Sequence, residues 1–322
     1  MKLSVMMITY NHERFIAQAI ESVLAQRVNF DCEIVIGEDC STDGTRAVIM
    51  DFHRRYPGRI VPLLRDRNLG AMRNFTETLA VCRGKYVAVL EGDDYWTHED
   101  KLQTQINFLD EHADHAICCH RAQFVDETGG GQSGIFPTIP AGTYTIADLF
   151  DGNLVVTCSV MYRWGSVGSL PSWFLTLKMG DWPLHILVAT AGKIHLMDEV
   201  MSVYRIHQGG VWSPLSSMSQ SREIARMLKA LDKHLDFQYT NAIRRTIGRC
   251  EHRIANSYLG MASIARQAGN RIETANHLAG YLRNGGLTVP GSRRAFASFA
   301  AYTLIGSWYK VFSRAKQTNR PR

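Results

Sequence analysis

Short apolar runs alternate with helical patterns over the first hundred residues of the chain. Four runs have the length of β-strands: Leu3 to Thr9, Glu33 to Gly37, Ile60 to Leu64 and Tyr86 to Leu90. The last of these is apolar at every position, as expected for a strand that is buried on both faces. Strands of this kind, separated by helices, indicate a parallel sheet covered by helices. The pattern therefore predicts an α/β fold.

Three helices are expected between these strands. The second follows Glu38, with Ser41 or Thr42 as its N-cap. The third opens after Asn68-Leu69-Gly70 and ends at Arg83-Gly84. The first has apolar residues at positions i, i+4, i+7 and i+8, which share one helix face: Ile16, Ile20, Val23 and Leu24.

Polar clusters follow three of the four strands directly. Thr9-Tyr10-Asn11 follows the first strand, EDCSTDGT (residues 38–45) follows the second, and EGDD (residues 91–94) follows the fourth. In parallel sheets, ligands bind outside the carboxyl ends of the strands. We therefore expect these three clusters to meet at one edge of the sheet and to form a site there.

The rest of the chain is organised differently. Residues 118–210 are less regular, and from Ser217 onward the pattern is wholly helical. We therefore expect an α/β domain over residues 1–214 and an all-helical domain over residues 215–322. Three apolar faces are predicted in the second domain: Ile224, Met227, Leu228, Leu231 and Leu235; Ile243, Ile247, Ile254, Tyr258 and Met261; and Ala275, Leu278 and Leu282.

The positive charge of the chain lies in its C-terminal tail. The formal net charge is +6, yet residues 275–322 contain eight Lys or Arg and no acid, so the remainder sums to −2. Aromatic residues are interleaved with these basic residues, which favours two interpretations: a last helix packed on its domain, or a helix lying on an anionic membrane. Nucleic-acid binding is not expected, because no binding motif is present.

Composition places the chain among globular proteins. The seven cysteines are odd in number and have no CxxC spacing, which argues against a disulfide framework and a zinc site and favours reduced thiols in the cytoplasm. The N-terminus has no signal-peptide cleavage site, and no run of 18 apolar residues indicates a membrane span. A cytoplasmic protein is expected, attached to the inner face of the membrane if its tail binds lipid.

The paired acids Asp93 and Asp94 are the strongest chemical signal. Adjacent carboxylates at the end of a buried strand repel each other unless a cation joins them, and a hard divalent ion bound to diphosphate oxygens is such a cation. The alternative is a solvated acidic turn or helix cap. Glu38 and Asp39 follow the second strand, where a carboxylate can accept hydrogen bonds from a base or a ribose.

The segments ITYNHERFIAQAIESVLAQ, EIVIGEDCSTDGT and NLGAMRNFTETLAVCRGKYVAVLEGDD resemble, in this order and spacing, the family 2 glycosyltransferases of the GT-A fold. The resemblance runs from Lys2 to Glu111 and returns at Gly180-Asp181 and Tyr204 to His207. It implies a GT-A catalytic domain over residues 1–214. The chain departs from the family at Glu38 and Glu91, where aspartate is common.

The resemblance also implies roles for individual residues. Asp94 and His207 are expected to hold a divalent metal, Mn²⁺ or Mg²⁺. A nucleotide-sugar donor, most often a uridine diphosphate sugar in this family, is expected to contact the following residues: Thr9, Tyr10, Asn11, Glu13, Asp39, Asn68, Gly70, Asp93 and Arg205.

Asp181 matches the position of the family's general base. An acceptor hydroxyl must lose its proton as it attacks the anomeric carbon, and a carboxylate that is ionised at neutral pH can accept this proton. The alternative for Asp181 is a helix N-cap, and Asp198 and Glu199 are nearby acids that compete for the role of base.

The implied reaction is an inverting, metal-dependent transfer of one sugar to a glycan or lipid-linked acceptor, in bacterial surface polysaccharide or lipopolysaccharide assembly. The QxxRW motif of processive synthases is missing, its nearest echo being residues 160–164, VMYRW. Two alternatives stay open: a nucleotide-sugar-binding protein without turnover, and a sugar nucleotidyltransferase, which usually opens with a Gly-rich loop. The absence of GxGxxG after the first strand disfavours a dinucleotide dehydrogenase.

Overall fold

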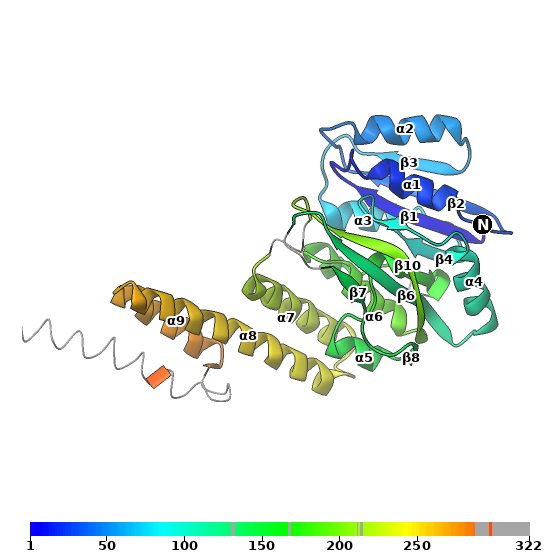
Figure 1. Cartoon of the computed structure of the whole chain (residues 1–322). Helices are drawn as coiled ribbons and strands as arrows, with labels where there is room; N and C mark the ends of the chain where they lie inside the picture. The colour runs from blue at the N-terminus through cyan, green and yellow to red at the C-terminus, as the bar shows by residue number, and fades with distance from the viewer. Residues whose placement is uncertain (130–132, 167–168, 211, 213–214, 287–295, 298–322) are drawn as a thin grey trace, which may run out of the picture. The chain divides into compact units, whose positions relative to one another are not determined.

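A single ten-stranded sheet organises residues 1–214 (Figure 1). The computed structural model describes the chain except for residues 130–132, 167–168, 211, 213–214, 287–295 and 298–322. The strand order is β3-β2-β1-β4-β9-β6-β10-β5, with β7 paired to β6 and β8 paired to β10. The strands are β1 (Leu3–Thr9), β2 (Cys32–Glu38), β3 (Ile60–Leu64), β4 (Tyr86–Val89), β5 (Tyr95–Trp96), β6 (His115–Asp126), β7 (Gly134–Phe136), β8 (Gly142–Tyr144), β9 (Met161–Arg163) and β10 (Lys193–Ile206).

The long strands of this sheet point in one direction. β1 pairs in parallel with β2 and β4, and β2 pairs in parallel with β3. β9 is antiparallel to both β4 and β6, and β6 is parallel to β10, so β6 and β10 run the same way as β1. The carboxyl ends of these six strands therefore lie at one edge of the sheet, and the predicted α/β fold with a mostly parallel sheet is confirmed.

Helices cover both faces of the sheet. Alternate residues of a strand point to opposite faces, and β1, β2 and β4 are buried at nearly every position, so both faces must be covered. The main core cluster lies on the face of Leu3, Val5 and Met7 and includes residues of α1, α2 and α4. α3 contacts β1 and β2. The helices of this unit are α1 (Ile16–Leu24), α2 (Thr45–Arg55), α3 (Ala71–Leu79), α4 (Lys101–Glu111), α5 (Ile146–Asp151) and α6 (Asp181–Ala189), with 3₁₀ turns η1 (Thr157–Ser159), η2 (Trp164–Ser166) and η3 (Ser172–Thr176).

Gly37 is required where α3 approaches β2. A Cβ atom at Gly37 would lie 2.0 Å from Thr78 Oγ1 and 2.6 Å from Asn74 Oδ1, both on α3. The Asn74 amide donates a hydrogen bond of 2.8 Å to the Gly37 carbonyl, so the helix is held directly on the strand backbone. This contact fixes the position of α3, whose N-terminus lies close to the carboxyl end of β2.

The predicted cap of α2 is wrong. The helix begins at Thr45 with Gly44 as N-cap, and neither Ser41 nor Thr42 caps it. Asp43 instead accepts hydrogen bonds from the Thr45 N–H at 3.0 Å and from the Thr45 hydroxyl at 2.6 Å. Ser41 and Thr42 are turned toward the loop after β1, where they bond to Asn11.

The region that was expected to be irregular contains two of the longest strands, β6 and β10. Their pairing has register shifts between Lys193 and Ile194, between Leu196 and Val200, and between Val200 and Ser202. These shifts interrupt the two-residue alternation, and that interruption is why the pattern did not predict β10.

The second unit comprises residues 215–322, and its described part is helical, as predicted. Its helices are α7 (Ser217–His234), α8 (Thr240–Gln267) and α9 (Arg271–Arg283). The predicted apolar face of α9 is wrong in phase, because Ala275 and Leu282 are exposed while Leu278 and Tyr281 are buried. The Tyr281 ring lies in a small core cluster with Ala255, and its hydroxyl donates to the Gly286 carbonyl.

Nearly all of the basic aromatic tail lies outside the described residues; within the described part, the Phe296 ring stacks on Tyr281 with ring centroids 5.7 Å apart. All seven cysteines lie in the described part and are free thiols. Among the described helices, none is both long enough and apolar enough to cross a membrane.

Candidate active site

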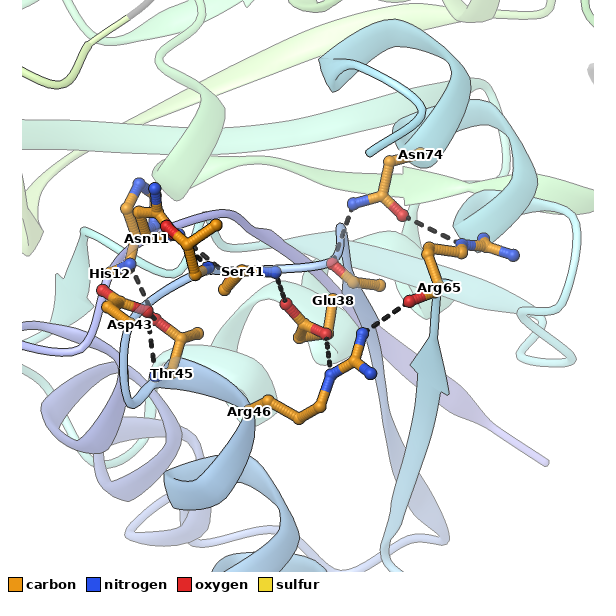
Figure 2. Close-up of polar contacts among 11 residues, drawn as sticks. Asn11, His12, Glu38, Ser41, Asp43, Thr45, Arg46, Arg65 and Asn74 are labelled. Carbon is orange, nitrogen blue, oxygen red and sulfur yellow. Dashed lines mark hydrogen bonds and ion pairs between the residues drawn. The ribbon is translucent and has the colours of Figure 1, made fainter. Parts of the chain in front are cut away.

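The loops after β1 and β2 are bonded to each other at the carboxyl edge of the sheet (Figure 2). The Asn11 N–H donates to Ser41 Oγ at 3.0 Å, and the Thr42 N–H donates to Asn11 Oδ1 at 2.8 Å. Asn11 has a φ of 56°, a left-handed conformation that asparagine tolerates better than most residues. The polar sequence after each strand thus builds one double loop.

Glu13 belongs to the same double loop. Its Oε2 accepts a hydrogen bond of 3.0 Å from the Gly44 N–H, and its own N–H donates to Asp43 Oδ2 at 3.1 Å. The structure therefore uses Glu13 to join the two loops. Tyr10, next to Asn11, is 41% exposed, so its ring is accessible to a ligand.

Glu38 is a buried structural carboxylate, which accounts for one departure from the family pattern. Its Oε1 accepts from the Ser41 N–H at 2.6 Å, and its Oε2 accepts from Arg46 Nε at 2.5 Å. Arg46 also donates to the Arg65 carbonyl at 2.5 Å, which ties α2 to the end of β3 (Figure 2). The side chain of Glu38 is fully buried, and both of its oxygens have donors within the protein.

Asp39 is bonded to the loop after β3. Its two carboxylate oxygens accept hydrogen bonds from the Leu69 N–H at 2.7 Å and from the Gly70 N–H at 2.9 Å. Gly70 has a φ of 83°, which favours glycine, and its N–H also lies 3.0 Å from Asn68 Oδ1. The Asp39 N–H donates to the carbonyl of Thr9 at 3.1 Å. These four predicted residues therefore lie together.

The turn after β4, residues 91–94, is called the acidic turn here and is held in place by the end of β10. The Arg205 N–H donates to Asp94 Oδ1 at 2.8 Å, and the Arg205 guanidinium donates to the Asp93 carbonyl at 2.5 Å. His207 Nε2 lies 2.9 Å from Asp93 Oδ2. Two segments that are more than a hundred residues apart in the sequence thus build one site.

The Arg205 side chain is only 7% exposed, and each of its guanidinium nitrogens has a partner. Besides the Asp93 carbonyl, it contacts Gln18 Oε1 and forms an ion pair of 3.1 Å with Glu127, while its guanidinium lies 4.4 Å from the Tyr95 ring centroid. In this structure Arg205 therefore positions the acidic turn.

The donor atoms at the acidic turn suit a divalent cation. Asp93 Oδ1 and Asp94 Oδ2 are buried and have no hydrogen-bond partner among the described residues. Two sets of residues could each hold a metal ion, because the ligand atoms within each set all lie within 4.8 Å of one another. One set is His12, Asp93 and His207, and the other is Glu91, Asp93 and Asp94. Buried carboxylate oxygens without donors are costly unless a cation joins them, so the residues fit the expected metal.

His12 is a member of this site that the residue-level predictions did not include. It follows Asn11 directly in the polar cluster after β1, so its position at the carboxyl edge was the available signal. Its side chain could not be assigned from the sequence, because its contact with Asp93 crosses from the first strand to the fourth.

The carboxylates of the site are electrostatically coupled. Burial, together with Asp93 and Asp181, raises the pKa of Glu91 to about 8. Burial and the charges of Asp93 and Glu91 raise the pKa of Asp94 well above its ordinary value. Burial also acts to raise the pKa of Asp93, but the hydrogen bond with His207 and the proximity of His12 hold it below its ordinary value. The site therefore concentrates negative charge on Asp93.

Asp181 is the first residue of α6, and the N-cap is Gly180, so the alternative that Asp181 caps this helix is wrong. Its Oδ2 accepts a hydrogen bond of 2.8 Å from the Asn153 amide. Burial raises the pKa of Asp181, although backbone hydrogen bonds at the start of α6 act in the opposite direction. The charge of Asp181 also contributes to the raised pKa of Glu91.

The two competing acids lie elsewhere. Asp198 and Glu199 are exposed and occupy the irregular middle of β10, away from its carboxyl end. Asp198 forms an ion pair of 2.8 Å with Arg121.

Comparison with solved structures identifies the fold class. The chain superimposes on S. aureus TarS 1-349, whose structure was solved in complex with UDP-GlcNAc, with a TM-score of 0.61 and 18% identity, covering 100% of this chain and 93% of that one. It also matches the mannosyltransferase PcManGT from Pyrobaculum calidifontis, solved with GDP-Man and Mn²⁺, with a TM-score of 0.53 and 13% identity, covering 97% and 87%. The expected GT-A fold is confirmed.

Sequence comparison gives the family. The model of the family described as "Glycosyl transferase family 2" matches residues 4–174, and this chain belongs to that family. The uncharacterized protein Rv1520 of Mycobacterium tuberculosis is 36% identical over 211 residues, which are 65% of this chain and 60% of that protein. TuaG of Bacillus subtilis, a putative teichuronic acid biosynthesis glycosyltransferase, is 36% identical over 107 residues, 33% of this chain and 41% of that protein. The chain thus spans less than two thirds of these relatives.

Proposed function

We propose that this chain is an inverting glycosyltransferase that moves one sugar from a nucleoside diphosphate donor to an acceptor hydroxyl and depends on a divalent metal. The observation that carries the proposal is the pair of buried carboxylate oxygens without donors, Asp93 Oδ1 and Asp94 Oδ2, at the carboxyl edge of the sheet. Family membership supports the reaction class. The catalytic role is assigned to residues 1–214, with residues 215–322 as a helical C-terminal domain.

The donor is proposed to lie along the loops after β1, β2 and β3. The hydrogen bonds among Asn11, Thr42, Asp39 and Gly70 hold these loops in place before any ligand binds. A rigid loop loses little conformational freedom on binding, so prior organisation favours affinity. Seven of the nine residues named from the sequence belong to this surface: Thr9, Tyr10, Asn11, Glu13, Asp39, Asn68 and Gly70. The other two, Asp93 and Arg205, meet at the acidic turn.

The acidic turn is proposed to hold the metal through Asp94, Asp93 and His207. When bound, a divalent ion neutralises the charge that develops on the departing diphosphate. Arg205 keeps the turn in position through two hydrogen bonds, one from its N–H to Asp94 and one from its guanidinium to the Asp93 carbonyl.

Asp181 is proposed as the general base. Its raised pKa makes it a stronger base than an exposed aspartate, and its carboxylate is oriented by the amide of Asn153. It would remove the proton from the acceptor hydroxyl as that oxygen attacks the anomeric carbon, which yields a β product from an α donor.

Single addition is favoured over chain extension. The segment most similar to the processive motif, residues 160–164, contains Arg163, which pairs with Tyr86. Because Tyr86 is the first residue of β4, Arg163 lies at the edge of the sheet opposite to the site. There it donates to the His115 carbonyl at 3.0 Å and to the Tyr86 hydroxyl at 3.1 Å. The arginine is thus a structural residue of the far edge.

The donor and setting follow by analogy only. TarS was solved with a uridine diphosphate sugar, and TuaG is named for teichuronic acid biosynthesis. We therefore propose a uridine diphosphate sugar as donor, a glycan or lipid-linked acceptor, and surface polysaccharide assembly at the cytoplasmic side of the membrane.

A panel of nucleotide-sugars tests the proposal, with thermal unfolding measured with and without Mn²⁺ or Mg²⁺. A donor at 100 times its Kd stabilises the fold by about 2.7 kcal/mol, and we expect this only with metal present. NMR of the product then gives the anomeric configuration, which must be opposite to that of the donor, and therefore β for an α donor. Donor binding without transfer to any acceptor would favour a binding protein without turnover, and release of inorganic pyrophosphate from a nucleoside triphosphate would indicate a nucleotidyltransferase.

A further inference from the structure

The backbone after β1 brings the His12 ring to the acidic turn. Asn11 has a left-handed φ of 56°, and the His12 N–H donates to Thr45 Oγ1 at 2.8 Å, so the residue is held from both sides (Figure 2). Unfavourable backbone conformations persist where the surrounding structure enforces them, and they cluster at functional sites. A loop held in this way directs a specific side chain toward the site.

The two histidines converge on one carboxylate oxygen. His207 Nε2 lies 2.9 Å and His12 Nε2 lies 3.7 Å from Asp93 Oδ2. Neighbouring ligand atoms around an ion held at about 2.0–2.2 Å lie roughly 2.8–3.6 Å apart. The separation from His207 lies within this range, and that from His12 exceeds it by only about 0.1 Å, which a small rotation of the ring would remove. The ring centroids of His12 and His207 are 5.9 Å apart, and both rings pack near Phe15, which limits their rotation.

We propose that His12 is a metal ligand of this chain together with His207 and Asp93, and that the two imidazoles make the site prefer a first-row transition ion such as Mn²⁺ over Mg²⁺. This inference rests on the proposed function, because it concerns the same metal site. Mg²⁺ favours oxygen ligands and keeps much of its water. First-row transition ions accept imidazole nitrogen, and although Mn²⁺ binds nitrogen the most weakly of them, it does so more readily than Mg²⁺. Asp93 Oδ1, buried and without a donor, and Asp94 Oδ2 supply further oxygens.

The hydrogen-bond pattern around the two histidines is compatible with this role. The Gly209 N–H lies 3.2 Å from His207 Nδ1, in an exposed turn, so His207 Nε2 carries the proton that it shares with Asp93. For Nε2 to bind a metal, this proton would shift to Nδ1 with no net gain or loss, and the contact of Nδ1 with the Gly209 N–H would open. His12 Nδ1 has no hydrogen-bond partner among the described residues, so no contact fixes its tautomer and Nε2 can bind metal directly.

The substitution His12→Gln tests the inference on the full chain with metal ions alone. Equilibrium dialysis gives the Kd for Mn²⁺ and for Mg²⁺. We expect His12→Gln to weaken Mn²⁺ binding by about tenfold or more and Mg²⁺ binding by less than about threefold, so the preference for Mn²⁺ falls. His112→Gln is the matched control, because His112 is an exposed histidine that ends α4, before the first residue of β6, and so lies at the opposite edge of the sheet.

Pulsed EPR of bound Mn²⁺ supplies a readout that a structural role would not change. It detects nitrogen bonded directly to the ion, so the parent protein should show two histidine nitrogens and either His12→Gln or His207→Gln should show one. An unchanged nitrogen signal, or an unchanged ratio of the two Kd values, overturns the inference. If His12→Gln does not fold by circular dichroism, His12→Asn replaces it, and the EPR signal of the parent alone decides whether two imidazoles bind.

The outcomes separate this inference from the proposed function. Two nitrogens on Mn²⁺ without transfer from any donor would support the ligand set and contradict the enzyme. Transfer from a donor with no nitrogen on the metal would do the reverse.

Discussion

Asp94 combines a structural contact and a functional one on the two oxygens of a single carboxylate. Oδ1 accepts the Arg205 N–H at 2.8 Å, while Oδ2 is buried without a partner among the described residues. In the variant Asp94→Asn the amide oxygen retains the first contact, so the fold should be preserved while the charge is lost. We expect the variant to lose metal-dependent donor binding, measured by isothermal titration with and without Mn²⁺.

Asp31→Asn is the matched control for this substitution, because Asp31 is exposed and directly precedes β2 at the opposite edge of the sheet. If Asp94→Asn bound donor and metal as tightly as the parent chain, the assignment of Asp94 to the metal would have to be withdrawn.

Asp181 should separate chemistry from binding. Asp181→Asn keeps a group that can pair with Asn153 but cannot accept a proton, so donor affinity should be unchanged while transfer falls by at least about 100-fold, the lower range for a general base. Kinetic measurement of kcat and of donor Kd checks both halves. Equal losses in binding and transfer would indicate a donor-contacting residue, and unchanged transfer would mean that another group is the base.

At the scale of elements, the sequence pattern was sufficient where burial is regular. β1 to β4 and their helices were predicted, because strands buried on both faces give continuous apolar runs. β10 was not, because register shifts near Val200 break its alternation. The phase of α9 was wrong because Tyr281, which packs in the small core with Ala255, defines the buried face better than Leu282 does.

The candidate site was predictable as a location and only partly as a set of contacts. Parallel strands bring the polar clusters to one edge, and this much follows from topology. The ion pair of the buried Glu38 with Arg46 depends on how the loop before α2 folds, and the support of the acidic turn by Arg205 depends on segments that are far apart in the sequence. Contacts of that kind leave no periodic signal in the sequence.

α4 contains a buried lysine that should reduce stability at neutral and acidic pH. Lys101 is fully buried; its ammonium lies 3.9 Å from the Trp96 ring centroid and donates to Gln105 at 2.9 Å. Burial lowers its pKa from 10.5 to about 7. Below pH 7 both the folded and unfolded chains bind the proton and the full cost of the buried charge applies, whereas between about pH 7 and 10.5 only the unfolded chain binds it, so stability rises with pH.

Lys101→Met should therefore stabilise the fold most at pH 6, by about 1–4 kcal/mol before the lost hydrogen bond to Gln105 is counted, and progressively less toward pH 10. Urea unfolding of parent and variant at several pH values gives the difference in free energy. Because the lost hydrogen bond does not titrate, the slope of that difference with pH is the informative quantity. A difference that stays constant from pH 6 to 10 would show that the folded and unfolded chains bind the Lys101 proton equally, so that burial does not lower its pKa.

At the scale of the whole molecule, charge is divided unequally along the chain. Residues 1–274 sum to −2, while residues 275–322 contribute eight positive charges and no negative ones. This division suits a protein whose catalytic part handles anionic substrates through a metal while another part attaches to an anionic surface. No element of the described residues tests this idea, since residues 298–322 lie outside them.

We expect the tail from Ser292 onward to bind anionic membranes and to be dispensable for donor chemistry. Each Lys or Arg near an anionic surface contributes about 1 kcal/mol, so the seven in this segment should give attachment that salt weakens. Its aromatic residues would lie at the headgroup level and add apolar burial. A chain truncated before Ser292 should bind its donor normally yet no longer sediment with anionic vesicles.

The full-length chain with its tail Lys and Arg replaced by Gln is the control that separates charge from aromatic burial. An insoluble truncated chain would make the tail part of the core, and a full-length chain that ignores anionic vesicles at low salt would leave the tail as ordinary packing.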